Sequence, residues 1–208
     1  MANPDISIRT DADDEVARPP SWEARPWPHD VAALVQAARQ GDAGAFERLY
    51  QAFAPMVHGL LLSRLPLYEV DDVMQDVFTT AFRQLPTLRE PAAFGGWLAA
   101  IARQRAAEFF RQMHRTESLD AASSAMAATD RRLEASLDAR TVLEQIRRLP
   151  ETYAETLTLR LVEGLTGPEI AAATGMTPDS VRVNLHRGLK LLRERLGVNI
   201  SRKVAGDT

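Results

Sequence analysis

The chain has 208 residues, of which 45% are hydrophobic and 25% charged, and this length suits one ordinary domain or two small ones. It contains no cysteine, which excludes disulfides, thiolate metal sites and cysteine nucleophiles. No apolar run approaches the ~20 residues that span a bilayer, and the N-terminus lacks the basic patch and apolar core of an export signal. We therefore expect two small domains in a cytoplasmic protein without membrane insertion.

The net charge of -3 hides an uneven distribution along the chain. Residues 1–30 carry seven acidic side chains and three arginines, whereas residues 178–203 carry seven basic and two acidic side chains. Lysine and arginine supply most of the non-specific affinity for DNA because they neutralise phosphates. The C-terminal end is therefore the candidate region for contact with nucleic acid.

Residues 1–28 mix prolines and acids without periodicity, and we expect a mobile arm there. Two apolar patterns of helical spacing follow, separated by Gly41-Asp42, and the second lies before Pro55. They predict two amphipathic helices or one interrupted helix. The patterns consist of Val31, Leu34, Val35 and Ala38, and of Phe46, Leu49, Tyr50 and Phe53.

The strongest helical pattern lies between Val70 and Leu85 and ends at Pro86. Its apolar stripe leaves the polar positions Asp71, Asp72, Gln75 and Asp76 on other faces. Another helix is predicted from about Phe94 to Arg111, with Trp97 and its apolar neighbours facing inward. Four helices then form a first domain over residues 29–115.

Residues 116–132 are rich in alanine, serine and threonine and read as a flexible linker. Helical spacing resumes in residues 133–200, and residues 201–208 form a tail. No segment alternates with a period of two, so the expected fold is all-α, with two small helical domains.

Residues 167–196 read GPEIAAATGMTPDSVRVNLHRGLKLLRERL and carry the signature of a helix-turn-helix. Pro168 opens the first helix, and Gly175 fits its exit because glycine adopts a left-handed backbone without strain. Thr177 can cap the second helix, with Pro178 at its first position. The second helix then presents an outer cationic side to DNA, formed by Arg182, His186, Arg187 and Lys190.

Within this helix Arg182 and Arg187 are candidate base readers, because a guanidinium donates two bonds to guanine. Lys190 and Arg193 suit phosphate contacts. The alternative is an ordinary helical hairpin with a solvated basic face, and a lone exposed histidine such as His186 is often incidental.

In the order and content of these segments, the chain resembles the extracytoplasmic-function class of bacterial sigma factors. The resemblance covers about residues 30–115, similar to sigma region two, and 137–197, similar to region four. The matching segments are GDAGAFERLY (41–50), DDVMQDVFTTAF (71–82), FGGWLAAIARQRAAEFFR (94–111) and the stretch from Leu149 to Leu196.

The resemblance implies specific partners. Core RNA polymerase would be bound through the β′ clamp helices and the β flap, with Asp72, Gln75 and Asp76 on the clamp helices. A solvated acidic face is the alternative for these three residues. Double- and single-stranded promoter DNA would be bound, and an anti-sigma factor is the family expectation. No cofactor, metal site or catalytic residue is implied.

The resemblance also implies DNA contacts. The loop from Leu88 to Gly96 would capture a base flipped out of the minus-ten element, and the following helix would track the separating strands. The implied minus-ten residues are Phe94, Arg103, Gln104, Arg105 and Arg111. The implied minus-thirty-five residues are Arg182, Val183, His186, Arg187 and Lys190.

The sequence departs from the family at four of these positions or their neighbours. Relatives commonly have asparagine where this chain has Gln104, and aspartate where it has Glu108. In the second helix of the motif, Val183 and Asn184 replace a serine and a basic residue. Promoter specificity therefore cannot be transferred from relatives.

Three other functions compete with a sigma factor as interpretations of this sequence. An enzyme is disfavoured because the four histidines are scattered and no phosphate-binding glycine loop occurs. A conventional helix-turn-helix regulator would leave the acidic helix at 71–85 unexplained. A sigma mimic that only sequesters an anti-sigma protein would not need Arg182, Arg187 or the arginines of residues 103–115.

Overall fold

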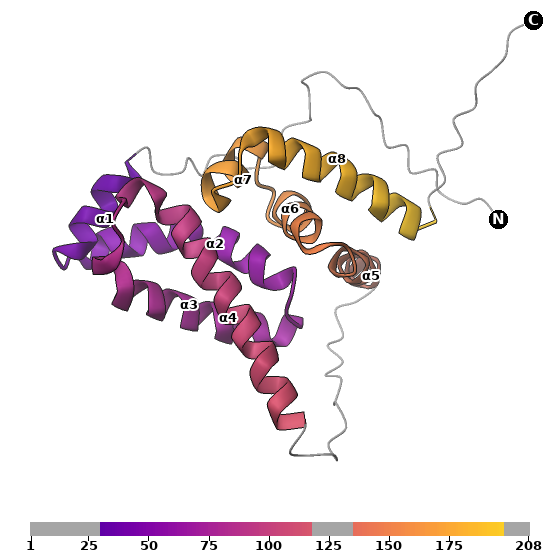
Figure 1. Ribbon diagram of the computed structural model, residues 1–208, viewed down its shortest axis with the longest axis horizontal. Coiled ribbons are helices and arrows are strands. Elements are labelled where there is room, and N and C mark those ends of the chain that lie inside the picture. The colour runs from indigo at the N-terminus through magenta and orange to yellow at the C-terminus, as the bar shows by residue number, and fades with distance from the viewer. Residues whose placement is uncertain (1–29, 118–134, 198–208) are drawn as a thin grey trace, which may run out of the picture.

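The computed structural model describes residues 30–117 and 135–197, with side chains placed for residues 30–113 and 139–197. This part of the chain is all-α, as the sequence predicted (Figure 1). The predicted arm at 1–28, the tail at 201–208 and most of the predicted linker lie outside the described residues. The helices are α1 (Val31–Arg39), α2 (Ala43–Leu62), α3 (Val70–Gln84), α4 (Phe94–Glu117), α5 (Ala135–Arg147), α6 (Glu151–Leu161), α7 (Gly167–Thr174) and α8 (Pro178–Arg195), with short 3-10 turns η1 (Leu67–Glu69), η2 (Leu85–Thr87) and η3 (Pro91–Ala93).

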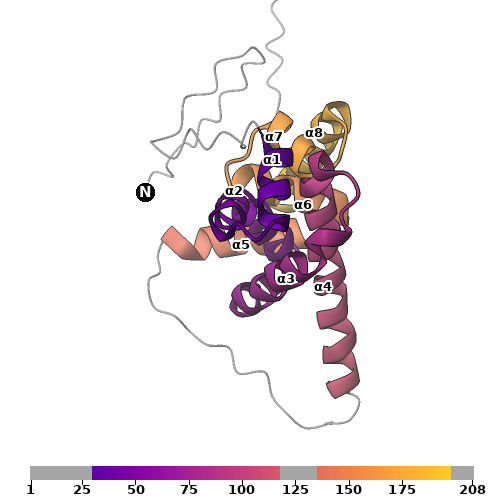
Figure 2. The same cartoon turned by 90° about the vertical axis from the view of Figure 1, so that its left-hand side faces the viewer.

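The first four helices form a bundle around α2, which packs against α1, α3 and α4. In both views the C-terminal half of α4 extends beyond the other helices (Figures 1 and 2). Asp30 and Asp42 cap α1 and α2 by accepting hydrogen bonds from Ala33 and Ala45. The four predicted helices of this domain are therefore present.

Helix α2 differs from the expectation that its apolar pattern stops before Pro55. It continues through Pro55 to Leu62, because buried residues continue on the far side of the proline. A proline inside a helix costs roughly 3 kcal/mol or more. Burial of Met56, Val57, Leu60 and Leu61 is enough to offset that cost, at about 1.5–3 kcal/mol for each large side chain.

The last four helices contain the predicted helix-turn-helix as α7 and α8. A reciprocal capping box starts α7: the Thr166 hydroxyl accepts from the Glu169 backbone, and the Glu169 carboxylate accepts from the Thr166 backbone. Gly175 ends α7 at φ 75°, in the left-handed region, and Thr177 caps α8. The local signals in the sequence thus fix this turn.

The two halves of the sequence share one core, although the sequence suggested domains joined only by a linker. Helix α2 packs against α6, and α4 packs against α7. Leu159, Ile170 and Val181 of the second half belong to the same buried cluster as α2 and α4. A smaller cluster lies between α5, α6 and α8 and includes Ile146, Leu157 and Leu192. In this structure the protein is closed, with helices of the second half packed against helices of the first half.

We predict that Gly175→Ala lowers the free energy of unfolding by about 1 kcal/mol, because an L-residue is strained in a left-handed conformation. A Cβ at this position would meet only Gly96 Cα at 3.7 Å, an ordinary contact, so the loss comes from the backbone. Urea denaturation followed by circular dichroism measures it. Gly167→Ala is the matched control, since Gly167 has open space and no positive φ, and it should be neutral or slightly stabilising. Equal losses in both variants would contradict the assignment.

Candidate nucleic-acid interface

Helix α8 is held in place by close packing against α6. Val181 is fully buried, and Gly188 faces α6 so closely that a Cβ there would lie 3.1 Å from Leu157 and 3.2 Å from Tyr153. The small residue therefore lets the two helices approach. This contact fixes which side of α8 faces outward.

The outward side of α8 carries all five residues predicted for the minus-thirty-five element. Every one of them is exposed: Arg182, Val183, His186, Arg187 and Lys190. Asn184 instead turns inward, and its side-chain amide lies 3.7 Å from the Met176 sulfur of the preceding turn. The exposed side combines three cations with one apolar side chain, which suits phosphate and base contacts.

Helix α3 presents a second surface, with Asp72, Gln75 and Asp76 all exposed. Beside them, aromatic side chains of α2 and α3 line a hollow of about 490 Å³. Phe82 belongs to the apolar stripe predicted to face inward, yet it is 57% exposed and stacks edge-on with Phe46 at 5.0 Å. The sequence pattern did not predict this exposed aromatic surface, because helical spacing identifies the apolar face of a helix but not how much of that face other helices cover.

One predicted minus-ten residue lies in the core of this structure. The Phe94 side chain is completely buried, with its ring 5.0 Å from Phe53 and 5.8 Å from Trp97. It cannot contact DNA in this arrangement and acts as a core residue beneath the loop. Arg39, which the sequence analysis overlooked, holds the start of that loop by donating to the backbone carbonyls of Leu85, at 3.1 Å, and Leu88.

The other predicted minus-ten residues all lie on α4, and their side chains contact different partners. They are Arg103, Gln104, Arg105 and Arg111. Gln104 is exposed and donates to Glu108 at 2.9 Å. Arg105 binds Glu108 at 2.8 Å and the Thr80 hydroxyl at 2.7 Å, and Arg111 is exposed. The hydrogen bond from Gln104, together with the nearby arginines, lowers the pKa of Glu108. This carboxylate therefore stays charged and orients Gln104 and Arg105.

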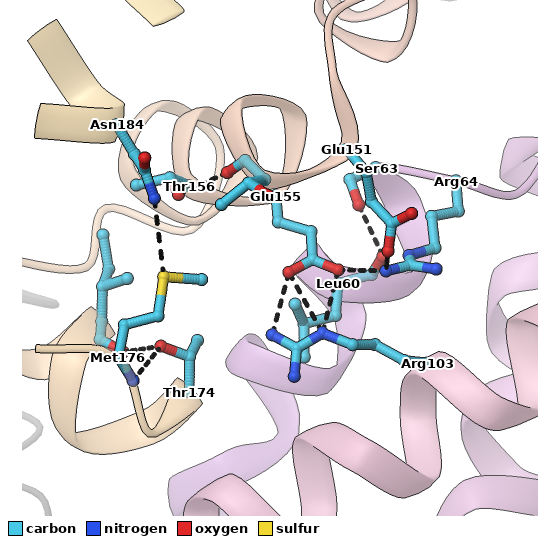
Figure 3. A network of polar contacts seen from close by, with 12 residues as sticks. Leu60, Ser63, Arg64, Arg103, Glu151, Glu155, Thr156, Thr174, Met176 and Asn184 are labelled. Carbon is cyan, nitrogen blue, oxygen red and sulfur yellow. Dashed lines mark hydrogen bonds and ion pairs between the residues drawn. The ribbon is translucent and has the colours of Figure 1, made fainter. Parts of the chain in front are cut away.

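Arg103 faces the second half of the chain and contacts Glu155 of α6. Its Nε and Nη2 donate to the two carboxylate oxygens of Glu155 at 3.0 and 2.9 Å (Figure 3). Arg64, at the end of α2, binds the same carboxylate and also Glu151. Glu155 is only 2% exposed. Sequence reasoning missed Arg64 and Glu155, because their role depends on how the two halves pack.

A second polar contact joins the halves, between α2 and the turn that follows α6. His58 Nδ1 lies 2.6 Å from a carboxylate oxygen of Glu163. The hydrogen bond to Glu163 raises the pKa of His58, with smaller contributions from the Glu163 and Asp71 charges, while burial acts in the opposite direction. When His58 is protonated, it forms an ion pair with Glu163 across the contact.

Comparison with known proteins shows two family regions in order. A model described as Sigma-70 region 2 matches residues 49–116, and one described as Sigma-70, region 4 matches residues 139–192. The chain is 32% identical to the RNA polymerase sigma factor CarQ of Myxococcus xanthus, over 76% of this chain and 93% of that protein. The chain belongs to the extracytoplasmic-function family of sigma factors.

Other relatives agree with this assignment. The chain is 30% identical to the ECF RNA polymerase sigma factor BldN of Streptomyces coelicolor, over 78% of this chain and 64% of BldN. Two solved structures share the fold: CnrH in complex with the cytosolic domain of CnrY (TM-score 0.57, 22% identity, 81% of this chain and 97% of that chain), and the sigma factor RpoE in complex with the anti-sigma factor NepR from Bartonella quintana (TM-score 0.51, 20% identity, 74% and 98%).

Sigma factors are transcription regulators rather than catalysts. Within residues 30–117 and 135–197, no group of three or more His, Asp or Glu side chains is arranged to hold a metal ion. Nor does any helix in these ranges have the length and apolar character to cross a membrane.

We predict that the His58 pKa, read from imidazole resonances in NMR titration, lies above 6.5 in this sigma factor and falls in Glu163→Gln. Because the folded pKa is raised, the ion pair stabilises the contact fully below pH 6.5 and loses that contribution as pH rises through the raised pKa. His58→Gln assigns the resonance. A pKa that does not respond to Glu163→Gln would refute the pairing.

Proposed function

We propose that this sigma factor binds core RNA polymerase, recognises minus-thirty-five and minus-ten promoter elements, and promotes DNA melting for transcription initiation. The observation that carries the proposal is the presence of both sigma regions in one chain, with an exposed cationic side on α8 in region four. Such a protein works in the cytoplasm, where promoter DNA and polymerase meet.

Region four would place α8 in the major groove of the minus-thirty-five element. Arg182 and Arg187 lie on its exposed side near the helix start and suit base contacts, while Lys190 suits a phosphate. Val183 and His186 lie on the same side and complete the surface. The adjoining β flap of the polymerase would hold region four in place.

Region two would act on the minus-ten element through α4 and the loop before it. Gln104 is exposed and ordered by Glu108, so its amide is available to a base edge. Arg103, Arg105 and Arg111 would follow the backbone of the separating strand. Phe94 would support the loop from below.

Core polymerase would dock on α3. Asp72, Gln75 and Asp76 are exposed there, beside the aromatic hollow, and suit basic or polar groups of the β′ clamp helices. An anti-sigma factor is a further partner that we propose, since the solved structure of RpoE contains the anti-sigma factor NepR. A helix-turn-helix regulator acting without polymerase would have no use for this acidic and aromatic face.

We predict that Arg182→Ala and Arg187→Ala each lower run-off transcription by reconstituted holoenzyme about 10-fold, because a lost base contact costs about 1–3 kcal/mol. Core binding in a pull-down should persist. Arg195→Ala removes an exposed charge from the last turn of the same helix and serves as the control. Normal initiation by both variants would show that α8 does not read the promoter in this way.

We also predict that Asp72→Lys and Asp76→Lys each weaken binding to core polymerase about 10-fold or more, because a like charge then faces a basic partner. Affinity is measured by competition for core enzyme with a labelled sample of the unmodified protein. Glu144→Lys makes the same charge change on exposed α5 and should leave core affinity unchanged. If all three variants bind core equally well, docking does not use α3.

A further inference from the structure

We infer that Arg64 and Arg103 form a phosphate-binding site for the backbone of single-stranded promoter DNA, and that Glu155 occupies this site while the protein is closed. The inference rests on the proposed function, because it assigns a ligand to the same minus-ten surface and names the residue that blocks this ligand in the closed protein. It adds Arg64, which neither the motif nor the helical pattern of region two indicates.

The geometry is that of an oxyanion site. Two guanidiniums from different elements, the end of α2 and the middle of α4, converge on one carboxylate (Figure 3). Arg103 approaches both oxygens through Nε and Nη2, which is the fork geometry that arginine also uses on phosphate. A phosphodiester presents the same pair of anionic oxygens as the Glu155 carboxylate.

Arg64 retains hydrogen-bonding capacity that the fold does not use. Its Nη2 binds Glu151 and Glu155, but its Nε is buried without a hydrogen-bond partner among the described residues. A buried donor left unsatisfied is unfavourable. An incoming phosphate that replaces Glu155 therefore has an additional donor within reach of the site.

The closed arrangement and DNA binding exclude each other at this site. Helix α6 lies directly over the two arginines, and the contact around it is tight. A Cβ at Gly59 would lie 2.8 Å from Leu159 of α6, and one at Gly95 would lie 3.0 Å from the Ala173 carbonyl of α7. Arg103 is half-buried, and its Nε and Nη2 are held by Glu155, so a phosphate can take these donors only when α6 moves away.

Separation of the two halves breaks the ion pairs of Glu155, and contacts between DNA phosphates and the freed arginines can offset that loss. Glu155 is buried, and a buried carboxylate is tolerated only when it is paired and hydrogen-bonded. When the halves open, water solvates Glu155, and the two freed arginines become available to phosphates. Arg64 and Arg103 therefore bind Glu155 in the closed state and a DNA phosphate in the open state, but not both at once.

The test measures binding of a fluorescein-labelled, mixed-sequence single-stranded oligonucleotide to the free full-length protein over a range of salt concentrations. Glu155→Gln removes the competing charge with little change in shape. We expect tighter binding, and a plot of log affinity against log salt that is steeper by about 0.7, since one additional phosphate contact adds roughly that much on single strands. Adding Arg64→Ala to this variant should remove about half of the increase, whereas Arg64→Lys should keep it.

Glu151→Gln is the matched control. Glu151 also binds Arg64, but it is 64% exposed and does not contact Arg103, so this variant should bind the oligonucleotide like the unmodified protein. An unchanged affinity and salt slope in Glu155→Gln would overturn the inference. So would an equal gain in Glu151→Gln, which would indicate a general charge effect.

A second measurement does not depend on the folding of any Glu155 variant. The chain has no cysteine, so Arg83→Cys on α3 and Glu194→Cys on α8, both exposed, allow two dyes to report the separation of the halves by energy transfer. The oligonucleotide should lower energy transfer with the same concentration dependence as its binding. Binding without any change in transfer would overturn the inference. A failure of run-off transcription with core enzyme would count against the proposed function instead, because both measurements here use the free protein.

Discussion

The packing of α6 against the first half of the chain is the contact on which this closed structure depends. Helix α6 is buried on more than one side: Leu159 faces α2, Leu157 faces α8, and Glu155 faces the two arginines. The positions of α7 and α8 follow from it, since α8 rests on α6 through Gly188. One short helix therefore sets both the orientation of α8 and the accessibility of α4.

The chemistry of this contact is unusual for a permanent core. An all-apolar interface of the same size would hold the halves together without a buried carboxylate, and replacing buried ion pairs with apolar groups is often neutral or stabilising. Here Glu155 meets Arg64 and Arg103, His58 meets Glu163, and Arg147 donates to the Leu62 carbonyl at 2.8 Å. Each of these groups can be solvated when the halves part. The contact therefore suits an interface that opens better than one that stays closed.

The sequence predicted what local signals determine. Capping residues, the glycine at the α7 exit and the apolar spacing located the helix-turn-helix and the four helices of the first half, because these features act over a few residues. The failures lie where distant segments meet. Proline at position 55 marks a helix end in isolation, but burial beyond it continues α2. Phe94 lies in the loop that the resemblance assigns to the minus-ten element, yet neighbouring rings enclose it in this structure. Glu155 reads as an ordinary surface acid in the sequence, because its burial depends on how α6 packs against the first half of the chain.

The exposure of the two other proposed surfaces suggests an order of events. The acidic and aromatic face of α3 and the cationic side of α8 are both exposed in the closed form, whereas Arg103 is half-buried and paired with Glu155. Polymerase can therefore meet α3 without any opening of the protein. Core enzyme that holds regions two and four apart at promoter spacing would remove α6 from Arg64 and Arg103 at the same step. On the proposed function, the minus-ten surface then becomes available only after polymerase is bound, and a free protein of net charge -3 has little tendency to occupy DNA beforehand.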